Sequence, residues 1–96
     1  MKTLFSIAKM GENKRYLFQT LSGVAEWLRK ETESDKFYVI DRDTIHYDIN
    51  AGCLSKVLVD SARNGMVAGI HVEVKRLEGL FTFPTEYLLT TEYVGD

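Results

Sequence analysis

The chain has 96 residues, 45% of them hydrophobic, 27% charged and 11% aromatic, which fits one folded domain over residues 1–96 and excludes a disordered chain. Fourteen acidic and twelve basic residues give a net charge of −2, which provides no bulk attraction to nucleic acid or to an anionic membrane. The longest stretch without a charge, residues 16–25, is about half a membrane span, so no membrane partner is expected.

The first two predicted elements are strands. Residues 3–9 and 15–21 are rich in aromatic and aliphatic side chains, which favour strands. The Gly-Glu-Asn sequence at residues 11–13 between them is typical turn chemistry. The pattern predicts a β-hairpin.

A first helix is predicted after the hairpin. Val24, Trp27 and Leu28 have the i, i+3, i+4 spacing that places side chains on one helical face. Ser22 is a candidate N-cap, and we expect the helix to end near Glu33.

Two further strands and a second helix are predicted next. Residues 37–40 are apolar on both faces, and residues 44–49 alternate between polar and apolar side chains, with a turn at 41–43 between the two strands. Asn50 is a candidate N-cap for a helix that the Asn-Gly pair at residues 64–65 ends. One face of this helix carries Leu54, Val57, Leu58, Ser61 and Ala62.

The last two predicted strands contain residues 70–74, which alternate between apolar and polar side chains, and residues 87–93. The resulting order is ββαββαββ. Residues 15–77 would form a ferredoxin-like βαββαβ core, completed by one added strand at each end. We therefore expect an α+β domain with an antiparallel sheet and two helices on one of its faces.

Catalytic and metal-binding motifs are absent from the sequence. No serine nucleophile elbow, P-loop, dinucleotide-binding glycine pattern or zincin motif occurs, so we expect neither an enzyme nor a cofactor. Asp41, Asp43, His46 and Asp48 lie close together, but their spacing favours a solvated turn over a metal site. The acidic run over residues 31–48 is interpreted as a solvated surface, with nucleic-acid mimicry as the alternative.

Cys53 is the only cysteine of the chain. An internal disulfide and a thiolate-rich metal site are therefore excluded, and a reducing compartment, the cytoplasm, is expected. At the start of the second helix this cysteine could be a nucleophile, but no histidine is adjacent in sequence, so an inert packing role is favoured.

Two binding surfaces compete as the functional hypothesis. The first is a protein-interaction surface over residues 79–87 and the strand that follows, with large apolar anchors beside Pro84. Its predicted partner-binding residues are Leu80, Phe81, Phe83 and Tyr87. The second is a nucleic-acid surface of interleaved basic and aromatic residues, whose basic members are Lys14, Arg15, Lys75 and Arg76.

The sequence favours the first hypothesis. We expect a non-enzymatic adaptor, or an inhibitor of a larger machine such as those that mobile elements encode, with a protein partner of unknown identity. The final strand is expected at a sheet edge, where it could also form a homo-oligomer with a second copy of the chain. A small-molecule enzyme would instead require a deep polar pocket around Cys53, His46 or His71.

Overall fold

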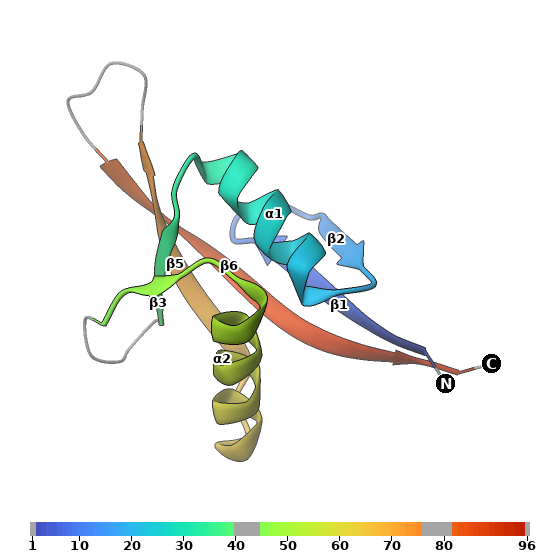
Figure 1. The fold of residues 1–96 in the computed structure, drawn as a ribbon. Helices are drawn as coiled ribbons and strands as arrows, with labels where there is room; N and C mark the ends of the chain where they lie inside the picture. The colour runs from blue at the N-terminus through green and yellow to red at the C-terminus, as the bar shows by residue number, and fades with distance from the viewer. Residues whose placement is uncertain (1, 40–44, 76–81, 96) are drawn as a thin grey trace.

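The computed structural model describes residues 2–39, 45–75 and 82–95, with side chains described over 2–39, 45–72 and 85–95 (Figure 1). The observed order of elements is the predicted ββαββαββ. The elements are β1 (Lys2–Lys9), β2 (Arg15–Phe18), α1 (Leu21–Thr32), β3 (Lys36–Val39), β4 (Tyr47–Asp48), α2 (Ala51–Arg63), β5 (Ala68–Lys75) and β6 (Thr82–Val94). Neither of the two helices in the described ranges has the length and hydrophobicity that crossing a bilayer demands.

The first helix begins earlier than the sequence predicts. Thr20, not Ser22, is the N-cap of α1, and its side-chain oxygen accepts a hydrogen bond from the backbone N–H of Gly23 at 3.1 Å. Because the helix starts at Leu21, β2 ends at Phe18 and is shorter than the predicted strand. The predicted end near Glu33 is confirmed, since this residue is the C-cap.

Both predicted ends of the second helix are confirmed. The side chain of Asn50 accepts a hydrogen bond from the backbone N–H of Cys53 at 2.8 Å, which satisfies a free donor of the first turn. At the other end Gly65 has φ +65°, a left-handed conformation that glycine adopts without a Cβ clash, and its N–H bonds to the carbonyl of Ala62.

The six strands form one antiparallel sheet in the order β2-β1-β6-β5-β3-β4 (Figure 1). The predicted ferredoxin-like order is not confirmed. The strands expected as additions at the two ends, β1 and β6, lie side by side in the middle of the sheet. The long ladder between them, from Lys2 opposite Val94 to Lys9 opposite Tyr87, separates β2 from the other core strands.

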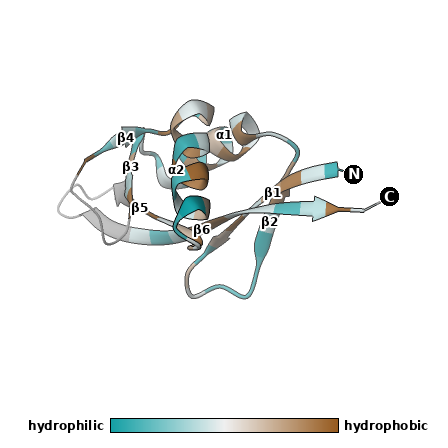
Figure 2. Cartoon of the chain, turned by 90° about the horizontal axis from the view of Figure 1, so that it is seen from below, coloured by the Kyte–Doolittle hydropathy of each residue, from teal (hydrophilic) through white to brown (hydrophobic). Residues whose placement is uncertain are grey.

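Both helices pack on one face of this sheet, contacting each other and β5 (Figures 1 and 2). Side chains from the helices and from alternate strand positions form the core between these layers. Its buried hydrophobic members are Ile7, Val24, Ala25, Leu28, Phe37, Ile49, Leu54, Val57, Ala68, Ile70, Val72, Tyr87 and Leu89. The helical faces predicted from sequence spacing therefore point into the core, with Trp27 and Leu58 partly buried at its margin. Ala62, which was also predicted on the buried face of the second helix, is exposed.

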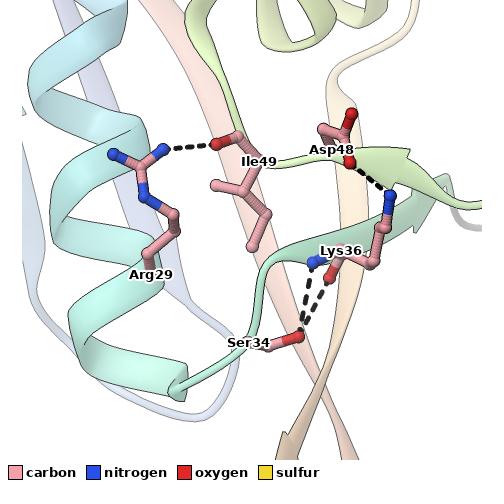
Figure 3. Close-up of polar contacts among 5 residues, drawn as sticks. All are labelled: Arg29, Ser34, Lys36, Asp48 and Ile49. Atoms are coloured by element: carbon pink, nitrogen blue, oxygen red, sulfur yellow. Dashed lines mark hydrogen bonds and ion pairs between the residues drawn. The ribbon is translucent and has the colours of Figure 1, made fainter.

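Polar contacts hold the short outer strand β4 to α1 on one side and to β3 on the other (Figure 3). Arg29 of α1 donates a hydrogen bond to the backbone carbonyl of Ile49, just after β4. Lys36 of β3 forms an ion pair with Asp48, its neighbour across the ladder. The two-residue strand β4 is thus held by side chains as well as by its backbone.

Candidate functional site

The final strand, β6, has different neighbouring strands before and after Leu89. Residues Thr82–Leu89 pair with β5 on one side, while Lys9 to Lys2 of β1 pair with Tyr87–Val94 on the other. The prediction that the whole strand lies at a sheet edge is therefore wrong. Beyond Leu89, however, β1 is the only partner of β6 among the described residues, so Thr90–Val94 leaves backbone groups free on the side towards β5. In Figure 1 this part of β6 runs with β1 away from the helices, towards the two chain ends.

A groove of about 300 Å³ follows this open edge. It lies between the C-terminal half of α2, the connection from α2 to β5, and the last part of β6. Its walls are formed by Leu58, Ser61, Ala62, Met66, Val67, Ala68, Leu89, Thr90, Thr91 and Tyr93. None of these side chains is a carboxylate, a histidine, a cysteine or a basic group, so the groove suits apolar side chains.

Three large apolar residues of the groove are unusually exposed. Tyr93 is 70% exposed, Met66 65% and Val67 56%. Met66 and Val67 lie on the connection between α2 and β5. A backbone hydrogen bond from the N–H of Met66 to the carbonyl of Ser61, at 2.9 Å, holds this connection to the helix. The connection is therefore anchored to the end of the helix while its apolar side chains face solvent.

The charged groups next to the open edge lie on the other face of the sheet. Residues alternate between faces along a strand, so the side chain of Glu92 points away from the helices, whereas Thr91 and Tyr93 point towards the groove. Thr90 borders the groove at the strand edge, but its hydroxyl lies on the same face as Glu92. Glu92 forms an ion pair with Arg15 of β2, and the hydroxyl of Thr90 shares a hydrogen bond with that of Ser6 at 2.5 Å. The open edge thus has an apolar side and a polar side.

Of the partner-binding residues expected from the sequence, only Tyr87 has a described side chain, and it does not line this groove. Leu80 and Phe81 lie outside the described residues, and the backbone of Phe83 pairs with Val74 inside the ladder between β5 and β6. Tyr87 is 1% exposed, so it is a core residue and offers no surface to a partner. Burial raises the pKa of Tyr87 to about 12, and the charges of Glu31 and Glu12 add to this shift.

The basic residues of the nucleic-acid hypothesis are dispersed. Lys14 lies over the ring of Tyr16, 5.0 Å from its centroid, and Arg15 is paired with an acidic residue. Through the pairings of neighbouring strands, Arg15 of β2 is level with Gly69 of β5 across the sheet. Lys75 is six positions farther along β5, about 20 Å at ~3.3 Å per residue, and its side chain, like Arg76, lies outside the description.

The other candidate groups have structural partners. The ring of Tyr38 meets His46 at 5.3 Å and His71 at 5.0 Å between centroids, and His71 Nε2 lies 2.8 Å from a carboxylate oxygen of Glu86. Cys53 packs against the hydrophobic core. Asp41 and Asp43 lie outside the described residues, within which no cluster of three potential metal ligands occurs.

The sequence carries a local signal for the groove in the connection that follows α2. Met66 and Val67 directly follow the Asn-Gly pair that ends α2, and connectors of this kind are normally polar. Apolar side chains in a connector are the same feature that singled out residues 79–87 in the sequence. The open edge itself had no local signal, because it depends on where β5 begins relative to β6.

No protein-family model matches the chain, and neither a curated protein nor a solved structure shows significant similarity to it.

Proposed function

We propose that this chain is a non-enzymatic protein-interaction module that binds an extended segment of a partner protein by adding a strand to β6. The observation that carries the proposal is the coincidence of free backbone groups at Thr90–Val94 with the apolar groove beside them. An added strand obtains affinity from main-chain hydrogen bonds and specificity from the side chains that enter a neighbouring pocket.

The groove determines the chemistry of this segment. Alternate residues of the added strand point towards α2, so they should be apolar and contact Met66, Val67 and Tyr93. The residues between them lie on the face of Thr90 and Glu92, where hydroxyl or basic groups fit best. An adaptor, or an inhibitor of a larger assembly in the cytoplasm, could use such a surface.

A phage-displayed library of random linear peptides, selected on the immobilised chain, tests the proposal. We expect enriched peptides with apolar residues at alternate positions. Their affinity, measured by fluorescence anisotropy, should fall at least about tenfold on Val67→Glu. Val59→Glu is the matched control, because Val59 is also an exposed valine, at 47%, but does not line the groove. Peptides that bind the Val67→Glu protein as well as the wild type would refute the proposed site.

A further inference from the structure

We infer that the open edge of β6 also pairs with the same edge of a second copy of this chain, in an antiparallel register centred on Glu92. The inference rests on the proposed function, because it names one occupant of the same groove. Such a pair would join two six-stranded sheets into one continuous sheet about a twofold axis. It would also cover both grooves, so self-pairing and partner binding would exclude each other.

The length of the open edge selects the register. Within the described part of the chain, five residues, Thr90 to Val94, have no partner on the side towards β5, and beyond them Leu89 is already paired with Ala68. Centring the pair on Glu92 places Thr90 opposite Val94 and Thr91 opposite Tyr93, which uses all five positions.

Other registers fit less well. A register centred on Thr91 would bring Tyr93 of the second copy opposite Leu89, where β5 already lies. One centred on Tyr93 would place Thr90 opposite residue 96, beyond the end of β6 at Val94. Centring between two residues would place helix-facing side chains opposite solvent-facing ones, because side chains alternate between the faces of a sheet.

The exposed apolar side chains at the groove and its open edge can pack against the same side chains of a second copy. Among the described residues, four of the eight exposed large hydrophobic side chains belong to the groove and its open edge: Met66, Val67, Tyr93 and Val94. The twofold axis keeps Tyr93 of each copy on the helix-covered face, next to the groove of the other. Each copy therefore supplies both an aromatic side chain and the apolar wall that receives it.

The charges at the axis make this association weak. Two Glu92 side chains meet in this register, and like charges directly opposite each other destabilise a strand pair. The ion pair with Arg15 in each copy offsets part of the repulsion. A weak dimer is what a groove needs if a partner strand is to displace the second copy.

Cysteine cross-linking tests the register. In a Cys53→Ser background, Glu92→Cys should form a disulfide-linked dimer under mild oxidation, because residue 92 faces itself across the axis. Thr90→Cys is the matched control on the same face and should not cross-link, whereas Thr90→Cys combined with Val94→Cys should. Equal cross-linking of the two single-cysteine proteins, or none at position 92, would overturn the inference.

Sedimentation velocity provides an independent measurement. The wild-type mass should rise with concentration from 11.0 kDa towards twice that value, and Val67→Glu should stay monomeric with an unchanged melting temperature. A chain that stays monomeric at every concentration yet selects groove-binding peptides would refute the dimer and support the proposed function. A chain that cross-links at position 92, but selects no peptide when it is immobilised at a density low enough to stay monomeric, would support the dimer and refute the proposed function.

Discussion

The rings of Tyr87 and Trp27 meet edge to face, with centroids 6.1 Å apart and planes at 90°. Trp27 also packs against Tyr16 and Phe18, at centroid distances of 4.8 and 6.1 Å, so it joins α1 to β2 and β6. We expect Trp27→Ala to lower the free energy of unfolding by about 3 kcal/mol, measured by urea denaturation. Glu26→Ala, an exposed change on the same helix, should cost less than about 0.5 kcal/mol. Equal effects of the two substitutions would show that the aromatic cluster does not stabilise the fold.

The buried phenol of Tyr87 predicts a loss of stability at alkaline pH. Its ordinary pKa of 10.0 applies to the unfolded chain, whereas burial raises the pKa in the folded protein to about 12. Below pH 10 both states keep the proton, so the stabilisation is fully present. As the pH rises towards 12 only the unfolded state ionises, and we expect about 2 kcal/mol to be lost.

Tyr87→Phe is the control for this pH dependence. It removes the ionisable hydroxyl while keeping the ring, and all other groups titrate alike in both proteins. The difference in unfolding free energy between wild type and variant should be constant from about pH 7 to pH 9 and then change as the wild type weakens. Parallel curves over the whole range would show that the phenol ionises equally well in the folded state.

Local sequence signals predicted the helices and strands because the interactions that form these elements are made between residues close in sequence. A cap such as Asn50 bonds within its own first turn, and the spacing of Val24 and Leu28 is a property of one helix. The strand order was not predictable in this way. It depends on Lys2 pairing with Val94, at the opposite end of the chain, and no turn signal specifies such a pairing.

The sequence predicted the chemistry of the candidate site and the strand that carries it, but not the residues that form it. The sequence favoured apolar contacts and the final strand, but it assigned Tyr87 to an interface although its ring fills the core. Alternation alone cannot tell which face of a strand is covered once both faces carry apolar groups. The open edge exists because β5 begins at Ala68, opposite Leu89, so that among the residues the structure describes only β1 pairs with the rest of β6.

Two residues at helix ends predict stability changes of opposite sign. Glu33 has φ 54°, a left-handed conformation that is costly for a residue with a Cβ, so Glu33→Gly should raise the free energy of unfolding by roughly 0.5–1 kcal/mol. Gly65 has φ +65° and nothing within 4 Å of an added Cβ, so Gly65→Ala should cost about 1–2 kcal/mol through backbone strain alone. Thermal unfolding that moves both melting temperatures in the same direction would contradict the left-handed assignments.

The ion pair of Arg15 with Glu92 predicts a non-additive effect on the proposed dimer. Arg15→Ala leaves the two Glu92 side chains at the axis uncompensated, so the dimer dissociation constant from sedimentation equilibrium should rise about two- to fivefold. Glu92→Gln should lower the constant, and adding Arg15→Ala to it should change nothing further, since no charge remains to be offset. Lys36→Ala is the control, because that lysine is paired with Asp48 on a different edge of the sheet. If Lys36→Ala weakened the dimer equally, or if the effects of Arg15→Ala and Glu92→Gln were simply additive, the two Glu92 side chains would not face each other.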